Sequence, residues 1–205
     1  MKTENLSAVP LIWEVPDQEQ YEYILVAHPD EEVHAKIMAE KQAFYEEYKE
    51  KIAIRTQPHV TVANFLAKEA MEDTIIRWME RIFSKYERFT VTLNNYSGFP
   101  PHTIYLRVQN AEPFQQLANE LKVVNTYVSS CSCPPMNIVL NPYVSIARKL
   151  APEIYFKALT QYAQKSFHES FLVNELLLLK RTRQYDTCKT INVFALRSAD
   201  NEPLN

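Results

Sequence analysis

The sequence predicts an α+β protein built from two pseudo-symmetric lobes. A short peptide occurs twice, as PHVTVA at residues 58–63 and as PYVSIA at residues 142–147. The predicted elements around the two copies follow the same order, which is strand, helix, motif strand, helix and strand. No Pro/Ser-rich linker interrupts this pattern, and 205 residues are enough for one unit with a sizeable core.

We therefore expect a single domain, residues 21–198, between two short flanking segments. Its two lobes should each contain one copy of the repeated peptide. The predicted parts are an N-terminal arm at 1–20 anchored by Trp13, lobes at roughly 21–97 and 98–198, and a C-terminal tail at 199–205.

The first lobe opens with a predicted strand and a long helix. The apolar run at 21–27 favours an extended backbone. Asp30 can then cap a helix, because its side chain accepts hydrogen bonds from free backbone N–H groups, and the glutamates after it favour the positive end of the helix. The apolar residues of this helix recur largely at helical steps or their multiples: Val33, Ile37, Phe44, Tyr48 and Ile52.

The first lobe continues with the motif strand, a second helix and another strand. β-Branched and small apolar residues predict a strand at 58–63, and proline is tolerated at its first position. The alternation of apolar and polar residues at 89–93 predicts the closing strand. The helix between them has an apolar face formed by Met71, Ile75, Trp78, Ile82 and Tyr86.

The second lobe repeats this order. A strand is predicted at 103–108, and the second motif strand lies at 142–147. Pro152 suits the first turn of the last helix, and two closing strands follow near 171–180 and 190–196. The apolar residues at helical steps are Phe114, Leu117, Leu121 and Val124 in the first helix of this lobe, and Ile154, Ala158, Leu159 and Tyr162 in the second.

Each motif strand presents one ring and one hydroxyl on a single face. Because side chains alternate along a strand, His59 shares a face with Thr61, and Tyr143 shares a face with Ser145. An approximate twofold axis between the lobes would bring both polar faces to one cleft. The two copies differ most at the ring position, where His59 corresponds to Tyr143.

The paired motif and the repeated element order resemble the 2H phosphoesterase superfamily, which includes cyclic nucleotide phosphodiesterases and 2′-5′ RNA ligase-like proteins. The resemblance covers roughly residues 20–198. It implies a bilobal pseudo-twofold fold in which two mostly antiparallel sheets line a central cleft, with the helices outside. Proteins of this group carry one His-x-Thr/Ser motif per lobe and act on phosphodiesters without a metal, so we expect no cofactor.

The resemblance assigns roles to four residues. His59 and Tyr143 take the two catalytic positions, where one group removes a proton from water or a sugar hydroxyl and the other protonates the leaving oxygen. Thr61 and Ser145 would bind the non-bridging phosphate oxygens, on which charge develops. The second position departs from the family pattern. Histidine, which ordinarily titrates near 6.5, can serve in either role, whereas a tyrosine phenol, at about 10, can donate a proton but hardly accept one.

Two hypotheses of different classes follow. The first is a metal-independent phosphodiesterase that acts on a nucleotide or RNA-end phosphodiester, such as a 2′,3′-cyclic phosphate, by hydrolysis or by ligation. The second is a non-catalytic phosphate- or nucleotide-binding module on the same fold, which the missing second imidazole favours. An interaction scaffold without a ligand is a third alternative.

The other histidines are weaker candidates for the site. His168 also precedes a serine by two positions, but it follows the last helix, so we expect it on the surface or at a strand end. His102 lies on a turn before a strand. His28 and His34 have no metal-like partner at a useful spacing, and we expect both on the surface.

Composition narrows the class of ligand. A single glycine, Gly98, excludes the glycine-rich loops of dinucleotide-binding and Walker-type sites. The net charge of −3 argues against a broad duplex-DNA surface and favours a small or single-stranded ligand. The basic run at 180–183, or Arg148 with Lys149, can steer a phosphate toward the protein.

The cysteines and the hydropathy pattern bear on location. The three cysteines, Cys131, Cys133 and Cys188, form neither a CxxC pair nor an even disulfide framework, so we expect reduced thiols. No basic-plus-apolar leader and no apolar run of about 18 residues occurs, which argues against a membrane partner. We therefore expect a cytoplasmic protein. The sequence does not determine its oligomeric state.

Overall fold

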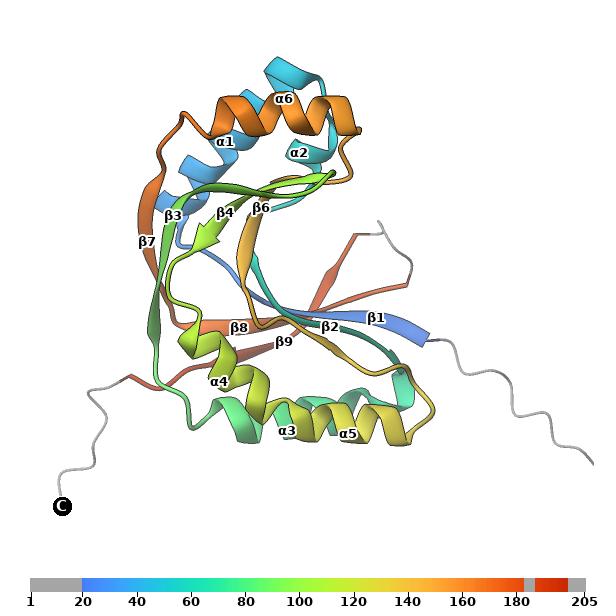
Figure 1. The fold of residues 1–205 in the computed structure, drawn as a ribbon. Coiled ribbons are helices and arrows are strands. Elements are labelled where there is room, and N and C mark those ends of the chain that lie inside the picture. The colour runs from blue at the N-terminus through green and yellow to red at the C-terminus, as the bar shows by residue number, and fades with distance from the viewer. Residues whose placement is uncertain (1–19, 183–186, 199–205) are drawn as a thin grey trace, which may run out of the picture.

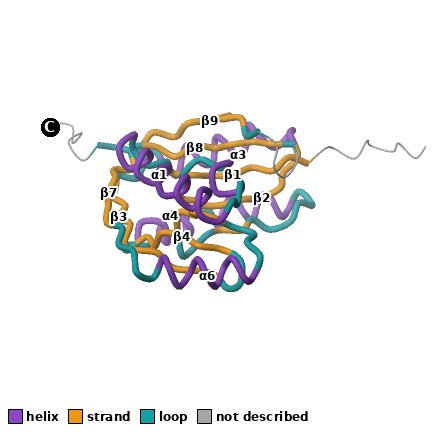
Figure 2. Tube along the Cα trace, turned by 90° about the horizontal axis from the view of Figure 1, so that it is seen from above, coloured by secondary structure: helices purple, strands orange, loops and turns teal. Residues whose placement is uncertain are grey.

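The computed structural model describes residues 20–182 and 187–198, and its first sheet contains five strands. Their spatial order is β5-β2-β1-β8-β9, and every pair of neighbours is antiparallel. Figure 2 shows β9, β8, β1 and β2 side by side in this order. The strands are β1 (Gln20–Ala27), β2 (Val60–Lys68), β5 (Asn137–Ile138), β8 (Glu175–Arg181) and β9 (Lys189–Ala195).

The second sheet contains four antiparallel strands in the order β6-β4-β3-β7. Its edge strand β6 is in contact with β2 of the first sheet, so the two strands that carry the repeated peptide lie beside each other. The strands are β3 (Phe89–Phe99), β4 (Thr103–Val108), β6 (Tyr143–Ala147) and β7 (His168–Val173).

The helices lie on the outer faces of the two sheets (Figure 1). α1 (Glu31–Tyr48), α2 (Ile52–Arg55) and α6 (Pro152–Tyr162) cover the second sheet. The first sheet is covered by α3 (Glu72–Phe83), which follows the 3₁₀ turn η1 (Glu69–Met71), and by α4 (Glu112–Glu120) and α5 (Lys122–Ser130). This arrangement confirms the predicted α+β class with antiparallel sheets inside and helices outside.

Each sheet takes strands from both halves of the chain. β3 belongs to the first half of the sequence but pairs with β4 and β7 in the second sheet. β8 and β9 come from the end of the chain and complete the first sheet beside β1. The helices are exchanged as well, because α1 packs on β6 and β7 while α4 packs on β2. The predicted lobes, 21–97 and 98–198, thus both contribute to each sheet.

Three predicted elements prove to be interrupted. The long first helix ends at Lys49, which adopts a left-handed backbone with φ of 59°, and Ile52 begins the separate helix α2. The helix predicted around Phe114–Val124 is divided at Leu121 into α4 and α5. The strand predicted near 171–180 is two strands, β7 and β8, because Asn174 ends the first of them.

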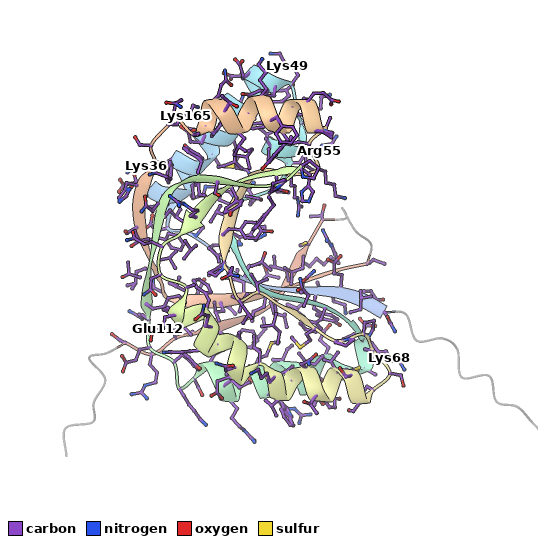
Figure 3. The ribbon with its side chains drawn as sticks, in the orientation of Figure 1. Lys36, Lys49, Arg55, Lys68, Glu112 and Lys165 are labelled. Carbon is purple, nitrogen blue, oxygen red and sulfur yellow. The ribbon has the colours of Figure 1, made fainter. Side chains whose placement is uncertain are left out.

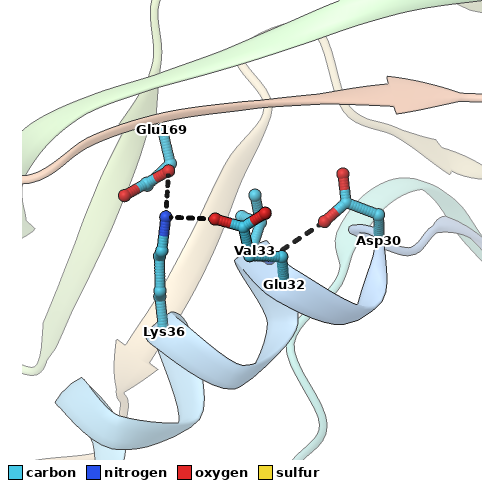
Figure 4. A network of polar contacts seen from close by, with 5 residues as sticks. All are labelled: Asp30, Glu32, Val33, Lys36 and Glu169. Atoms are coloured by element: carbon cyan, nitrogen blue, oxygen red, sulfur yellow. Dashed lines mark hydrogen bonds and ion pairs between the residues drawn. The ribbon is translucent and has the colours of Figure 1, made fainter.

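The start of α1 confirms the predicted cap (Figure 4). Asp30 accepts a hydrogen bond from the Val33 amide at 2.9 Å. Lys36 then joins Glu32 of its own helix, at 2.8 Å, to Glu169 of β7, at 2.9 Å. Such exposed pairs contribute little to stability, because water screens their attraction. Their effect here is to fix α1 against the second sheet.

The apolar faces predicted for the helices form the core between helices and sheets. Val33, Ile37 and Phe44 of α1 are buried, as are Ile75 and Ile82 of α3. Figure 3 shows charged side chains such as Lys49, Lys68 and Glu112 on the periphery. The predicted tail and residues 1–19 of the predicted arm lie outside the described residues, and Gln20 is the first residue of β1. Within the described residues, no helix is both long enough and apolar enough to span a membrane.

Gly98, the one glycine of the chain, lets α6 approach β3 closely. A Cβ at this position would lie 2.5 Å from Tyr155 Oη and 3.1 Å from Leu159 Cδ1. The Tyr155 side chain is fully buried, so it has little room to move. We expect Gly98→Ala to lower the free energy of unfolding by about 1–3 kcal/mol, the usual cost of overpacking a core. Urea denaturation measures this change.

A second substitution tests whether the contact with Tyr155 causes the loss of stability in Gly98→Ala. Since the nearest atom is the Tyr155 hydroxyl oxygen, the double variant Gly98→Ala/Tyr155→Phe should lose less stability than Gly98→Ala alone. The Tyr155 hydroxyl has no hydrogen-bond partner among the described residues, so its removal should itself cost little. A Gly98→Ala variant as stable as the wild type would contradict the close approach.

Candidate functional site

His59 lies immediately before β2, after the turn that follows α2. Its Nδ1 is 2.8 Å from the Gln57 carbonyl oxygen. A carbonyl only accepts, so Nδ1 carries the proton and the lone pair of a neutral ring is on Nε2. Burial lowers the pKa of His59 to about 4, and His28, Lys41 and Arg148 act in the same direction, against the hydrogen bond to Gln57. His59 is therefore neutral at pH 7, with Nε2 able to accept a proton.

The lowered pKa of His59 makes stability depend on pH. The unfolded imidazole titrates near 6.5, so between pH 6.5 and 4 the unfolded chain binds the proton more tightly than the folded protein does. The contribution of His59 to stability is thus present above pH 6.5 and is lost as the pH falls toward 4, by up to about 3 kcal/mol. The lowered pKa of His28, caused by burial, acts in the same direction.

We expect His59→Asn to show a smaller loss of stability between pH 7 and pH 4 than the wild type. Asparagine can still donate to the Gln57 carbonyl but does not titrate. Urea midpoints at pH 7, 5 and 4 measure the difference. His168→Asn, at an exposed position at the start of β7, is the control and should retain the wild-type pH dependence. Equal pH dependence in the wild type and His59→Asn would contradict the lowered pKa of His59.

A buried lysine lies behind the second motif strand. Lys41 of α1 is fully buried. Its Nζ donates to the Ser145 and Ile146 carbonyl oxygens, at 3.0 and 3.4 Å, and to Thr56 Oγ1 at 3.2 Å. All three acceptors are neutral. Burial, with the neighbouring charge of Arg148, lowers the pKa of Lys41 to about 8, so the ammonium group is still mostly charged at pH 7.

Arg148 adds a second cation at the same place. It follows β6 directly, and its Nε is buried without a hydrogen-bond partner among the described residues. No carboxylate forms an ion pair with Lys41 or Arg148 within 20–182 and 187–198. Buried charges are ordinarily paired, because desolvation costs several kcal/mol per ion. The two uncompensated cations beside His59 therefore favour an anion at this site.

The motif hydroxyls come from the two strands that meet here. Thr61 on β2 is opposite Val26, and Ser145 on β6 is opposite Tyr105. Both residues are partly buried. The backbone carbonyl of Ser145 accepts a hydrogen bond from Lys41, so the Lys41 ammonium group of α1 lies next to the residue that carries the second motif hydroxyl. Cations and neutral donors of this kind suit phosphate oxygens.

Comparison with known proteins assigns the family. The family model described as the 2′-5′ RNA ligase superfamily matches residues 29–184. The chain belongs to the 2′-5′ RNA ligase superfamily. This membership confirms the 2H phosphoesterase resemblance seen in the sequence. The match includes all four predicted site residues and both cations.

Several solved structures are similar to this chain over most of its length. E. coli LigT complexed with 3′-AMP is 17% identical, with a TM-score of 0.61 over 87% of this chain and 99% of that chain. TT0787 of Thermus thermophilus is 18% identical, with a TM-score of 0.66 over the same shares. E. coli LigT complexed with NADP⁺ is 16% identical, with a TM-score of 0.60 and the same coverage. These likenesses concern the fold. No curated protein matches the sequence.

Tyr143, at the predicted second catalytic position of this superfamily member, is held in an aromatic cluster. Its ring centroid is 5.1 Å from that of Phe99 and 5.1 Å from that of Tyr105. Phe99 and Tyr105 stack on each other at 4.4 Å. By strand register, Tyr143 shares its face with Ser145 and Arg107. The phenol is thus packed against neighbouring rings of its own sheet.

Two histidines that the sequence analysis expected on the surface lie near His59. The ring centroids of His28 and His59 are 6.3 Å apart. His34 Nε2 donates to the Gln57 side-chain oxygen at 2.8 Å, while the Gln57 carbonyl accepts from His59. No signal in the sequence indicates that His28 lies near His59. Their proximity follows from the pairing of β1 with β2, which the sequence does not reveal.

The remaining candidates lie elsewhere or are already paired. His102, on an exposed turn, hydrogen-bonds with Thr103 Oγ1 at 2.6 Å. His168 is exposed at the start of β7, as expected. Lys180 pairs with Glu69 and Glu72, at 2.6 and 2.7 Å, and Arg181 pairs with Glu22 at 2.7 Å. These two cations of the basic run are therefore engaged by carboxylates. Arg183 lies outside the described residues.

No metal site accompanies the histidines in the part of the chain that the structure describes. No group of three or more His, Cys, Asp or Glu side chains is placed there to hold a metal ion. The described residues of the candidate site supply imidazole for proton transfer, together with cations and hydroxyls that can stabilise an anion.

Proposed function

We propose that this protein is a metal-independent phosphodiesterase of the 2H type that hydrolyses a nucleotide or RNA-end phosphodiester, with a 2′,3′-cyclic phosphate as the substrate. The observation that carries the proposal is the neutral His59 ring near two cations, the buried Lys41 and the partly buried Arg148, which form no ion pair among the described residues. A general base and an anion site are two of the features that metal-free phosphodiester hydrolysis uses.

In the proposed reaction, His59 Nε2 removes a proton from a water molecule, and the water oxygen attacks phosphorus. The bond from phosphorus to one sugar oxygen breaks, and that oxygen takes up a proton to become a hydroxyl. Thr61 and Ser145 donate to the non-bridging oxygens, where negative charge increases, and the charges of Lys41 and Arg148 favour the same change. Tyr143 can act only as a donor.

The ligands of similar structures support a nucleotide as substrate. E. coli LigT is seen in complex with 3′-AMP and with NADP⁺. For this chain we propose a small nucleotide or an RNA end rather than duplex DNA, because the net charge is −3. We also expect a cytoplasmic location, as the cysteine pattern predicts.

The test combines binding and turnover in one set of samples. Thermal stability of the wild type and of His59→Ala is measured with 2′,3′-cyclic and linear nucleotides, and products are analysed in the same mixtures with EDTA present. Stabilisation of the wild type with product formation, both lost in His59→Ala, is the expected result. Absence of product from every substrate tested would refute the enzymatic proposal.

A binding module is the second candidate, and the aromatic packing of Tyr143 favours it. A ring held by Phe99 and Tyr105 supplies no base. A module of this kind predicts stabilisation by nucleotides without product.

The variant Tyr143→His separates the enzyme from the binding module, because an imidazole at this position should create hydrolysis only if the residues around it already form a catalytic site. A folded Tyr143→His variant that binds nucleotides without product would favour the module.

A further inference from the structure

The rings of His28 and His59 occupy neighbouring positions on two paired strands. β1 ends at Ala27, which is opposite Val60 at the start of β2, so His28 and His59 continue the two strands at the next position. Their ring centroids are 6.3 Å apart and their planes are inclined by 42°. Two imidazoles at this separation can both reach oxygens of one phosphoryl group, since each hydrogen bond adds about 2.8 Å.

The proposed hydrolysis still needs a second group that transfers a proton. Tyr143, at the position where the family has its second histidine, has no imidazole, and its ring packs against Phe99 and Tyr105. We propose that His28 is this second group and acts with His59 across β1 and β2. The inference rests on the proposed function. It places both imidazoles on the first sheet, one at the end of each strand, and leaves the second sheet to bind phosphate through Ser145 and Arg148.

The charges around the two rings assign their roles. His59 faces Lys41 of α1 and Arg148 after β6, and both cations favour its neutral form. His28 lies near His34 of α1 and Glu175 of β8. Burial and His34 lower the pKa of His28, while the Glu175 carboxylate acts in the opposite direction. Because only His28 has a carboxylate that favours its protonated form, we assign the acid role to His28 and the base role to His59.

The step is balanced in protons and bonds. His59 Nε2 takes one proton from water as the water oxygen bonds to phosphorus. Protonated His28 gives one proton to the sugar oxygen as its bond to phosphorus breaks. The products are a phosphomonoester and a sugar hydroxyl, and the two rings have exchanged protonation states. Proton exchange with solvent restores neutral His59 and protonated His28.

The first arm of the test is the hydrolysis of cytidine 2′,3′-cyclic monophosphate by full-length wild type, His28→Asn, His59→Asn and the control His168→Asn. We expect kcat to fall about 10²-fold or more in His28→Asn, with KM changed less than about threefold. The decline of wild-type kcat at high pH, where His28 is unprotonated, should be absent in His28→Asn. His168→Asn should retain the wild-type profile. Wild-type kcat and pH profile in His28→Asn would overturn the inference.

The second arm does not depend on turnover. Histidine ring signals are followed by NMR while cytidine 3′-monophosphate is added. We expect the signals of both His28 and His59 to shift, with both pKa values raised by the bound dianion, and that of His168 to stay in place. If the wild type shows no hydrolysis but both rings respond, the proposed function fails while the paired-histidine phosphate site is supported. A His28 signal that does not respond overturns the inference.

Discussion

His59→Asn is expected to lower kcat/KM for a 2′,3′-cyclic nucleotide by about 10²–10⁴-fold, the usual contribution of a positioned general base. Asparagine can preserve the donor toward the Gln57 carbonyl, which His59 Nδ1 contacts at 2.8 Å, but it has no group that accepts the water proton. The fold should survive because the ring is only partly buried. Product formation under single-turnover conditions measures the loss.

The control for this loss is His168→Asn, which removes an exposed imidazole from β7 and should leave kcat/KM within about twofold of the wild type. Far-UV circular dichroism and the urea midpoint at pH 7 establish that His59→Asn is folded. Undiminished hydrolysis by folded His59→Asn would mean that the reaction occurs at another site.

Lys41→Met should weaken the binding of a 3′-nucleotide by about tenfold or more at pH 7, with little change in stability. The variant removes a buried charge, which relieves its desolvation, but it also leaves the Ser145 and Ile146 carbonyls without their donor. These two effects on stability oppose each other. The loss of affinity is not offset, because the ligand phosphate loses the attraction of a positive charge in a site of low dielectric.

The pH dependence of binding identifies the charge as the cause. Lys41 is protonated below its pKa of about 8, so wild-type affinity should decrease as the pH rises through this value, or somewhat above it once the anion is bound. Lys41→Met should lack this decrease. Lys36→Met, which removes an exposed, ion-paired lysine from the same helix, is the matched control and should bind as the wild type does. Titration calorimetry at pH 7 and pH 9 gives the comparison. Equal affinity of wild type and Lys41→Met at pH 7 would refute the electrostatic role.

Local patterns predicted the type and order of most elements, since helical and strand periodicities depend on residues close together in the chain. Two of the three interruptions were missed because no local signal marks them, whereas Asn174, a residue type that disfavours strands, was an overlooked signal for the third. Lys49 adopts a left-handed conformation without being glycine or asparagine, and Leu121 between α4 and α5 has ordinary helical angles. The two-residue strand β5 is too short to show a period. Strand pairing between distant segments, such as β1 with β8, has no periodic signature at all.

The candidate site was predictable where a motif exists and unpredictable where it depends on pairing. His59, Thr61, Tyr143 and Ser145 were found from the repeated peptide. Lys41 carries a signal that was overlooked: it lies four residues after Ile37 and three before Phe44, on the apolar stripe of α1. A lysine in such a stripe lies either at the edge of the apolar face, with its ammonium group in water, or inside the protein with polar partners. His28 carries no such signal, because its proximity to His59 follows from the register of β1 with β2.

The exchange of strands between the sheets has a consequence for how the chain folds during synthesis. β1 leaves the ribosome long before β8, so one of its edges stays unpaired until β8 is made. The bidentate contact of Arg181 with Glu22 joins residues 159 positions apart. Closing so long a loop is slow, and an unpaired strand edge invites association with other chains. This edge of the nascent chain is thus exposed until β8 has emerged, and a chain that stops before residue 175 would keep the edge open permanently.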